Sequence, residues 1–310
     1  MDIAIIGAGL IGRAWSVAFA RGGASVRLFD PVAGAVEKSI AEIPRMLADL
    51  AELDLLGGQS ADDITGRIAL APSLGDAVRD VDYLQECAPE KVDLKAALFA
   101  EIDRHVSGKT VLASSTSIIL PSLFTGHLAH KAQAIVVHPL NPPHLIPAVE
   151  VVPAPWTSPE TIDRTRTIQL AIGQKPIVMM KEIDGFLMNR LQGALLEECF
   201  RLLEGGYVSA EDVDVGLKDG LAMRWSFMGP FETIDLNAPG GIRDYVQRYD
   251  GGFIKIRDGA MHRADWQGAT LDRAEAERRA LLPAEKLAER HRWRDRQLMQ
   301  LAAFRKRRTE

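Results

Sequence analysis

Cysteine is scarce in this sequence, which contains only Cys87 and Cys199 among 310 residues. Two cysteines cannot build the disulfide framework that stabilises small secreted domains. The sequence therefore excludes a disulfide scaffold and favours a reducing cytoplasm as the compartment.

Long apolar runs and an excess of positive charge are also missing. No run of about 18 apolar residues occurs, so we expect neither a transmembrane helix nor a membrane partner. The first residues lack a basic leader and break at Gly7, which indicates a strand rather than a signal peptide. The formal charge is −5, whereas phosphate binding normally needs a basic excess, so we expect no nucleic-acid partner.

What the sequence does contain is an ordinary globular composition, with 47% hydrophobic and 25% charged residues. This balance excludes wholesale disorder and a collagen-like repeat. A chain of 310 residues is about twice the roughly 150-residue prior for one domain, so two domains are the default expectation.

Short apolar runs alternate with helical patterns over the first part of the chain. The first 30 residues predict one βαβ unit. Strands are predicted at 3–6, 24–29, 81–87, 110–115, 134–138, 149–152 and 176–180, and helices at 14–20, 36–56, 93–106 and 159–172. This alternation is typical of a doubly wound, mainly parallel α/β sheet of the Rossmann type.

The strand rhythm stops near Lys181, and a long helix is predicted over 186–203. We therefore predict a nucleotide-binding domain over 1–182 and an all-helical C-terminal domain over 183–310. Residues 271–310 hold 12 Lys and Arg against 7 Asp and Glu. This excess is consistent with a solvated amphipathic helix or with a face that binds anions.

A glycine motif, GxGxxG, follows the first predicted strand and opens the first predicted helix. Gly7 permits the tight turn, Gly9 lets the backbone approach a pyrophosphate, and Gly12 lets the helix pack on the sheet. In this context a dinucleotide site is favoured over a glycine turn that binds nothing.

Three further residues complete the predicted cofactor site. The N–H groups of Leu10 and Ile11 lie at the predicted helix N-terminus, where the helix dipole favours phosphate oxygens. Asp30 ends the second strand and can accept hydrogen bonds from a ribose 2′-hydroxyl, while its charge repels a 2′-phosphate. The sequence therefore favours NAD over NADP.

A histidine and a glutamate stand out in two neighbouring strands. His138 ends an apolar strand at the edge where ligands bind in open α/β sheets, although a buried structural histidine is the alternative. Glu150 interrupts the apolar run 148–152, where a buried charge without a partner costs several kcal/mol. A His138–Glu150 pair would orient the ring and stabilise imidazolium, as proton abstraction from a hydroxyl requires. The alternative for Glu150 is an edge carboxylate that faces water.

Several segments in fixed order resemble the 3-hydroxyacyl-CoA dehydrogenase family, and more closely its lambda-crystallin branch, which includes L-gulonate 3-dehydrogenase. The resemblance covers nearly the whole chain. The family segments are 7–12, 114–117, 138–142, 149–152 and 185–190, and those of the branch are 220–233, 293–295 and 298–299.

The resemblance implies catalytic roles for four residues. His138 would be the base, Glu150 its charge partner, and Ser117 and Asn189 hydrogen-bond donors to the reacting oxygen that help to fix nicotinamide or substrate. Asn141, in the loop after His138, would contact substrate. Taken alone, Ser117 would be a turn residue and Asn189 a tolerated polar residue of a helix.

The resemblance also bears on the cofactor and on assembly. Glu90 and Lys95 match family positions that contact the cofactor, although their spacing alone indicates a surface pair. The family further implies a homodimer through the helical domain. No metal site is predicted.

Two features argue against an acyl-CoA substrate. Coenzyme A carries phosphates, yet residues 46–66 contain no Lys or Arg and several acidic residues. Arg224 precedes the segment 228–232, and its guanidinium could hold a free carboxylate. A surface or interdomain ion pair is the alternative role for Arg224.

The sequence therefore predicts an NAD-dependent dehydrogenase that oxidises the 3-hydroxyl of a small polar 3-hydroxy acid, with L-gulonate as the best candidate. Short-chain L-3-hydroxyacyl-CoA and carnitine-like 3-hydroxy acids are the alternative substrates. A non-enzymatic NADH-binding, crystallin-like protein is the alternative of another class. The preferred substrate, the direction of flux and the oligomeric state stay open.

Overall fold

The computed structural model describes residues 1–259, 262–264 and 266–309. The chain forms two compact units. The first contains Met1–Arg190 together with Arg292–Glu310, and the second contains Leu191–His291.

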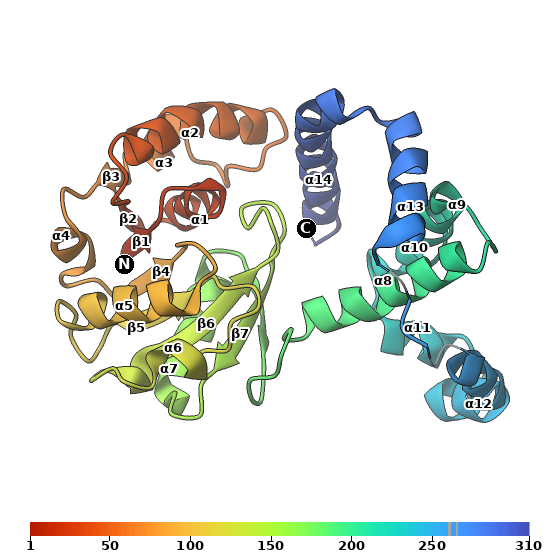
Figure 1. The fold of residues 1–310 in the computed structure, drawn as a ribbon. Coiled ribbons are helices and arrows are strands. Elements are labelled where there is room, and N and C mark those ends of the chain that lie inside the picture. The colour runs from red at the N-terminus through yellow and green to blue at the C-terminus, as the bar shows by residue number, and fades with distance from the viewer. Residues whose placement is uncertain (260–261, 265, 310) are drawn as a thin grey trace. The chain divides into compact units, whose positions relative to one another are not determined.

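The centre of the first unit is an eight-stranded sheet with the order β3-β2-β1-β4-β5-β6-β7-β8 (Figure 1). The prediction of a Rossmann-type, mainly parallel sheet followed by a helical part is confirmed. The strands are β1 (Asp2–Ile6), β2 (Ser25–Phe29), β3 (Ile68–Leu70), β4 (Tyr83–Glu86), β5 (Val111–Ser114), β6 (Ala134–Pro139), β7 (Ala148–Pro153) and β8 (Lys175–Val178).

One strand pair departs from the parallel pattern. The first six strands in the order of the sheet, β3, β2, β1, β4, β5 and β6, all run in the same direction. Strand β7 pairs with β6 antiparallel, and β8 is parallel to β7. In the β6–β7 register His138 lies directly opposite Glu150. Directly opposed residues of an antiparallel pair project their side chains from the same face at close range. The reversal of β7 thus brings together two residues that are 12 positions apart in the chain.

Helices cover both faces of this sheet, because alternate strand residues point to opposite sides. Ile3 and Ile5 belong to a core shared with α1, α2 and α7, whereas Ala4 and Ile6 belong to a core shared with α4, α5 and α6. The helices of this part are α1 (Leu10–Arg21), α2 (Ala35–Ala51), α3 (Ala61–Thr65), α4 (Leu74–Val78), α5 (Val92–Asp103), α6 (Ser122–Thr125), the 3₁₀ turn η1 (Lys131–Gln133) and α7 (Pro159–Ala171).

The helix predicted over 36–56 is shorter in the structure. Helix α2 ends at Ala51, and the chain then turns through left-handed conformations at Asp54, Gly57 and Gly58, with φ of 54°, 68° and 77°. A right-handed helix cannot contain such residues, so the helical pattern beyond Ala51 does not continue as a helix.

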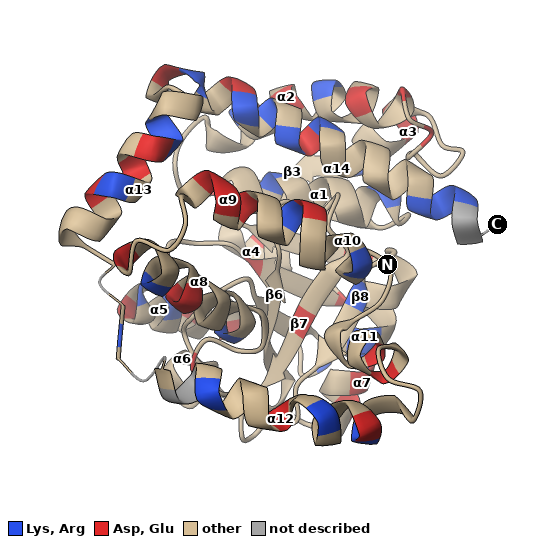
Figure 2. Ribbon diagram, turned by 90° about the vertical axis from the view of Figure 1, so that its right-hand side faces the viewer, with Lys and Arg blue, Asp and Glu red and all other residues tan. Residues whose placement is uncertain are grey.

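The last helix, α14 (Leu287–Thr309), belongs to the first unit from Arg292 onward. Met299 is 6% exposed within the core of the first unit, and Arg296 and Lys306 pair with Glu52 and Asp54 at 3.0 and 2.7 Å. Figure 2 shows cationic positions at the C-terminal end of α14, and the sequence places four more in its first half, Arg290, Arg292, Arg294 and Arg296. The compact units therefore do not coincide with the ranges 1–182 and 183–310, which stay a prediction for the functional domains.

The second unit is helical and has a small core. Its fully buried described residues are Leu203, Thr233, Ala238 and Ala264. Its elements are α8 (Met188–Glu204, from Leu191 onward), α9 (Ala210–Val215), the π-helical turn η2 (Gly216–Leu221), α10 (Ala222–Trp225), α11 (Pro230–Leu236), α12 (Gly241–Gly259), α13 (Gly268–Leu281) and the 3₁₀ turn η3 (Ala284–Lys286).

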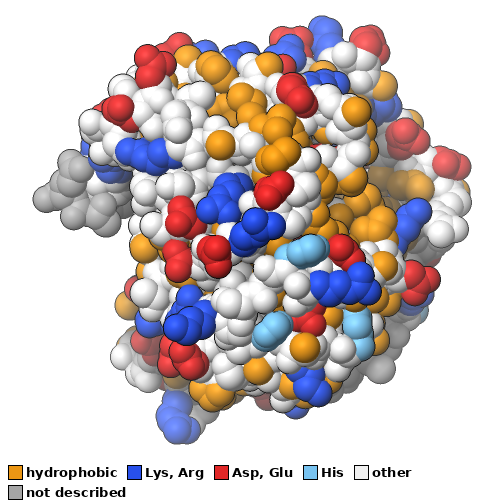
Figure 3. Space-filling model, turned by 90° about the vertical axis from the view of Figure 1, so that its left-hand side faces the viewer, with side chains coloured by type: hydrophobic (Ala, Val, Ile, Leu, Met, Phe, Trp, Pro, Cys, Tyr) orange, Lys and Arg blue, Asp and Glu red, His pale blue; other side chains and the backbone are white. Residues whose placement is uncertain are grey.

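On the face shown in Figure 3, cationic and acidic side chains are interspersed rather than separated into areas of one sign. Within the described ranges, every helix is too short or too polar to cross a membrane.

Candidate active site

The glycine turn after β1 leaves no room for side chains at two of its positions. Gly7 has φ +106°, and a Cβ there would lie 2.8 Å from the Cys87 carbonyl oxygen. A Cβ on Gly12 would lie 1.8 Å from the Gly7 carbonyl oxygen. A Cβ on Gly9, in contrast, would meet no atom within 4 Å. Gly7 and Gly12 are thus required by the fold, whereas Gly9 leaves open space beside the turn.

That open space lies at the N-terminus of α1. Gly9 is the N-cap residue and supplies no side-chain hydrogen bond, and the first turn holds no acidic residue. The first backbone N–H groups of a helix have no partner within the helix, and Leu10 beside them is 69% exposed. Free N–H groups, the helix dipole and a gap at Gly9 together fit the pyrophosphate of a dinucleotide.

Asp30 stabilises the same turn. One carboxylate oxygen accepts a hydrogen bond from the Ala8 N–H at 2.7 Å, and the other accepts from the Val32 N–H at 2.9 Å. The carboxylate therefore connects the end of β2 to the turn after β1. Its predicted contact with the cofactor ribose stays a prediction.

The other predicted residues gather at the same edge of the sheet. Strands β1, β4, β5 and β6 are consecutive neighbours and parallel, so Gly7, Cys87, Ser115 and His138 lie at the ends of adjacent strands. In open α/β sheets this carboxyl edge is where ligands bind.

The His138–Glu150 pair is present in the structure. His138 Nδ1 lies 2.6 Å from Glu150 Oε2, and the residues are 6% and 0% exposed. The Phe186 ring packs against the imidazole with 5.8 Å between centroids. Because Nδ1 is bound to the carboxylate, Nε2 is the ring nitrogen that can take a proton from a substrate.

Glu150 also holds the start of α8. Its second oxygen, Oε1, accepts hydrogen bonds from the backbone N–H groups of Leu187 and Met188 at 2.6 and 2.8 Å. A carboxylate at a helix N-terminus is stabilised by the unpaired N–H groups and the helix dipole. The buried charge of Glu150 thus fixes both the His138 ring and the helix turn that carries Asn189.

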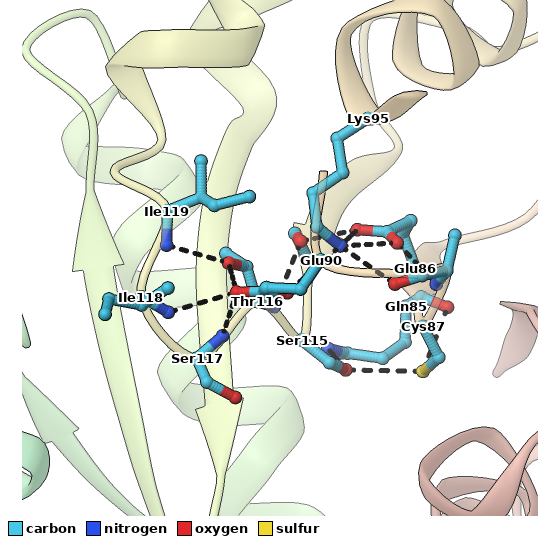
Figure 4. Close-up of polar contacts among 12 residues, drawn as sticks. Gln85, Glu86, Cys87, Glu90, Lys95, Ser115, Thr116, Ser117, Ile118 and Ile119 are labelled. Atoms are coloured by element: carbon cyan, nitrogen blue, oxygen red, sulfur yellow. Dashed lines mark hydrogen bonds and ion pairs between the residues drawn. The ribbon is translucent and has the colours of Figure 1, made fainter. Parts of the chain in front are cut away.

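Asn189 connects this turn to the loop after β5. Its amide nitrogen donates a hydrogen bond to the Ser117 carbonyl oxygen at 2.6 Å. In Figure 4 the Ser117 side chain points away from the Glu90 carboxylate. In the first unit, Glu150 thus binds both His138 and the N–H of Met188, and Asn189, the next residue, binds Ser117.

Glu90 holds the loop that carries Ser117. Its Oε1 accepts hydrogen bonds from the Thr116 hydroxyl, from the Ser117 N–H at 2.9 Å and from the Ile118 N–H at 3.1 Å (Figure 4). Glu90 thus acts on the loop backbone in this structure, and its predicted contact with the cofactor stays a prediction.

Lys95 is buried, although its spacing from Glu90 alone predicts a residue at the surface. Its ammonium group is 1% exposed and donates to both oxygens of Glu86 at 2.8 and 2.9 Å and to the Ala88 carbonyl at 3.2 Å. Burial raises the pKa of Glu86, although Lys95, the Ser114 hydroxyl and the Ala88 N–H oppose the shift. The predicted cofactor contact of Lys95 stays a prediction.

Sequence reasoning missed Glu86 and Thr116. Glu86 ends a strand of mixed character, with Asp82 and Gln85 in the same run 81–87, so its charge stands out less than that of Glu150 in the apolar run 148–152. Thr116 carries no such signal, because a threonine in a turn is ordinary.

Two predicted substrate residues stand apart from this hydrogen-bonded set. Asn141 is exposed in the loop after β6. Arg224 lies on α10 in the second unit, and within the described part of that unit its guanidinium makes no ion pair. Both roles stay predictions.

Other chemistries have little support at this edge. Burial raises the pKa of the Cys87 thiol to about 12, so this sulfur stays protonated near neutral pH. Among the described residues, no cluster of three His, Cys, Asp or Glu side chains could hold a metal ion.

A Rossmann-type sheet with a dinucleotide turn beside a His–Glu pair defines an NAD-dependent oxidoreductase that acts on a CH–OH group. Residues 2–183 match the NAD-binding domain of 3-hydroxyacyl-CoA dehydrogenase, and residues 185–267 match its C-terminal domain. The chain belongs to the 3-hydroxyacyl-CoA dehydrogenase family.

Relatives match over most of the chain. Lambda-crystallin of Oryctolagus cuniculus is 43% identical over 98% of this chain and 96% of that protein. L-Carnitine dehydrogenase of Oceanobacillus iheyensis is 36% identical over 80% of each chain. The NAD⁺-dependent dismutase 5-formyl-3-hydroxy-2-methylpyridine 4-carboxylic acid 5-dehydrogenase has a similar structure, with a TM-score of 0.83, 26% identity, and coverage of 98% of this chain and 97% of that one.

The glycine turn yields a prediction that separates folding from cofactor binding. Gly12→Ala should destabilise the protein by about 1–3 kcal/mol, because the added methyl group overlaps a backbone oxygen. Gly9→Ala should leave stability unchanged but weaken NADH binding roughly 5–150-fold, since its methyl group enters the space assigned to the pyrophosphate. Urea unfolding and NADH fluorescence titration measure the two effects. Wild-type NADH affinity in Gly9→Ala would contradict the assignment.

The Glu86–Lys95 pair yields a prediction about pH. Lys95→Met leaves a buried carboxylate without its cation and should cost about 3–5 kcal/mol near neutral pH. Because burial raises the Glu86 pKa in the folded state, protonation relieves this cost, so stability of the variant should fall as pH rises above the ordinary range of a glutamic acid. Urea unfolding at about pH 5 and about pH 8 should show that Lys95→Met loses more free energy of unfolding, relative to wild type, at the higher pH.

The exposed neighbour Lys91 offers a matched control for this measurement, and Lys91→Met should change stability by less than about 0.5 kcal/mol. If the free energy of unfolding lost in Lys95→Met did not vary with pH, an unpaired Glu86 would not be the cause of the loss.

Proposed function

We propose that the protein oxidises the 3-hydroxyl group of a small polar 3-hydroxy acid with a free carboxylate, such as L-gulonate, to the 3-keto acid. The observation that carries this proposal is the buried His138–Glu150 pair, 2.6 Å apart at the sheet edge that also bears the dinucleotide turn. Bound NAD supplies the hydride acceptor. Every other part of the reaction depends on side chains of this chain.

His138 is the base in this proposal. Glu150 binds Nδ1, so the hydroxyl proton is accepted by Nε2 and the resulting imidazolium is stabilised by the adjacent carboxylate. Glu150 cannot swing away, because its other oxygen is held by the N–H groups of Leu187 and Met188. A fixed carboxylate keeps the imidazole oriented through the proton transfer.

Ser117 and Asn189 position the reacting oxygen. The Ser117 backbone is held from one side by Glu90 and from the other by the Asn189 amide. We assign the Ser117 hydroxyl as a donor to the substrate oxygen, with Asn189 keeping the serine in place. Asn141 is assigned to the substrate because its loop continues directly from His138.

The free acid is favoured over an acyl-CoA by the charges near residues 46–66. This stretch has no cation of its own, and the cations that approach it from α14, Arg296 and Lys306, are engaged by Glu52 and Asp54. Phosphates at Glu52 and Asp54 would therefore meet carboxylates whose cations, Arg296 and Lys306, are already paired. The names of two relatives, an L-carnitine dehydrogenase and a dehydrogenase of a pyridine carboxylic acid, also indicate substrates with a free carboxylate.

We also propose a homodimer formed through the second unit, in a reducing cytoplasm. Large apolar side chains of this unit are exposed, including Tyr207 at 77%, Phe231 at 76% and Phe227 at 67%. Large exposed apolar side chains of this kind favour an interaction site, which is where a partner subunit would cover them. Both cysteines are free thiols, which agrees with a reducing compartment.

The dimer is tested by sedimentation equilibrium, which should give twice the mass of one chain at micromolar concentration. Phe253→Glu should shift the equilibrium toward monomer, because it places a charge on the exposed face of α12, where Phe253 is 53% exposed. Leu170→Glu, at an exposed leucine of α7 in the first unit, is the control and should not. A wild-type protein that sediments as a monomer would contradict the proposal.

The base is tested by two substitutions. His138→Gln should lower kcat roughly 10²–10⁴-fold, the usual contribution of a positioned general base, while NADH affinity changes little. Glu150→Gln should cause a smaller or comparable loss. The double variant should be little slower than His138→Gln, because Glu150 acts through the same imidazole. Independent, multiplying losses would show that the two residues do not act as a pair.

The substrate class is tested through Arg224. Arg224→Met should lower kcat/KM for free hydroxy acids roughly 10–150-fold, the effect of losing a charged hydrogen-bonded contact of about 1.5–3 kcal/mol. It should scarcely change kcat/KM for an L-3-hydroxyacyl-CoA, which has a thioester in place of the carboxylate. Arg243→Met, at an exposed arginine of α12, is the matched control. Unchanged activity of Arg224→Met toward every free acid would refute the anchor role.

A further inference from the structure

A cavity of about 650 Å³ lies in the first unit, away from the residues of the candidate active site. The C-terminal half of α14 forms one wall, and the segment 143–147 forms another. The end of α1 at Arg21, the turn 54–57 and the start of β8 complete the lining. A volume of this size is typical of sites for small organic ligands.

The polar part of the lining is mainly cationic. It includes Arg21, Lys175, Arg305 and Lys306, and a single acidic residue, Asp54. Asp54 is engaged by Lys306 at 2.7 Å. Beside the Lys306–Asp54 pair, Arg21 and Lys175 bring two further cations to the lining, in a chain whose formal net charge is −5.

Arg21 is the cation that most needs a partner. Its guanidinium donates to two backbone carbonyls, those of His144 at 3.0 Å and Leu55 at 3.5 Å, and forms no ion pair within the described residues. Burial lowers the pKa of Arg21, which shows that its charge is partly removed from water. A partly buried cation without a carboxylate is unfavourable, and an anion in the cavity would offset that cost.

Two uncharged side chains support the same inference. Burial, and after it the charges of Arg21 and Arg13, lower the pKa of His144 to about 3, so His144 is neutral near neutral pH. His144 Nδ1 and Gln174 Oε1 are buried without a hydrogen-bond partner among the described residues, and Gln174 is 4% exposed. Both residues line the cavity.

The rest of the lining is apolar. Leu55, Leu145 and Ile146 face the cavity from the first part of the chain, and Leu298 and Leu301 face it from α14. Aliphatic walls beside a cationic group suit a ligand with a charged head and a hydrocarbon chain, because each part then meets a surface of its own kind.

We propose that this cavity binds an organic anion with an aliphatic chain, its carboxylate or phosphate head at Arg21, Lys175 and Arg305 and its chain against the leucines of α14. Two cations of the lining, Arg305 and Lys306, belong to the basic segment 271–310, for which the sequence allowed either a solvated helix or an anion-binding face. It shares no residue with the dehydrogenase site and does not depend on the proposed substrate.

The test is isothermal titration of the full-length protein, saturated with NADH, using octanoate, octyl phosphate and 1-octanol. Either anion should bind saturably with one site per chain, and the tighter one identifies the preferred head group. 1-Octanol should bind at least about tenfold more weakly, because it lacks the charge. Octanol that bound as tightly as both anions, or anions that failed to bind, would overturn the proposal.

Two substitutions on α14 locate the site. Arg305→Met should weaken octanoate binding about three- to fivefold, as expected for an exposed charge, whereas Arg307→Met, on the same helix but outside the cavity, should not. Ala302→Trp should abolish binding by filling the cavity. Binding that was unchanged in both Arg305→Met and Ala302→Trp would place the anion elsewhere.

The melting temperature and the NADH affinity of each variant should match wild type, which keeps this result separate from the dehydrogenase proposal. Should Ala302→Trp fail to fold, the exposed pair Arg305→Met and Arg307→Met still decides the question. Equal octanoate affinities in that pair would overturn the site.

Discussion

The buried carboxylate of Glu150 is the constraint on which the site depends. A charge that is 0% exposed must be compensated, and this one is compensated on both oxygens, by the His138 ring and by the two N–H groups at the start of α8. The antiparallel register of β7 against β6 makes this possible, because it sets Glu150 directly opposite His138. One side chain thereby fixes the imidazole ring of His138 and the start of the helix that carries Asn189.

A second buried carboxylate supports the other side of the site in the same manner. Glu86 ends β4, pairs with Lys95 and lies beside the loop that Glu90 holds by its backbone (Figure 4). Breaking a buried ion pair by removing one partner is strongly destabilising, so these residues hold the loop 114–118 in a single arrangement. The dinucleotide turn, with Gly7 against Cys87, packs directly against the end of the same strand. The glycine turn, the loop that carries Ser117 and the His138–Glu150 pair therefore lie at the same edge of the sheet.

Those parts of the fold and of the candidate site that have a strong local pattern can be predicted from the sequence alone. Continuous apolar runs identified the strands of the sheet, except the three-residue β3, and a charge inside such a run identified Glu150. The direction of β7 has no comparable signal, because the residue pattern of an apolar strand is the same whether its neighbour is parallel or antiparallel. The short helices α3, α4 and α6 are too brief to show a helical period.

Long-range contacts explain the remaining differences. The spacing of Lys95 from Glu90 alone indicates a surface pair, because the buried partner Glu86, nine positions earlier, is brought to Lys95 only by the fold. The return of α14 to the first unit depends on pairs such as Arg296 with Glu52, which are 244 residues apart. No spacing rule relates residues at such separations. The roles of Ser117, Asn189 and Arg224 came from family resemblance, since each residue type is ordinary in its local context.

The most direct measurement of the central claim is NADH formation by the wild-type protein with L-gulonate and with L-3-hydroxybutyryl-CoA, under identical conditions. The account predicts that both reactions need NAD and that kcat/KM is higher for the free acid. A clear preference for the CoA thioester would contradict it, as would a protein that binds NADH but oxidises neither substrate.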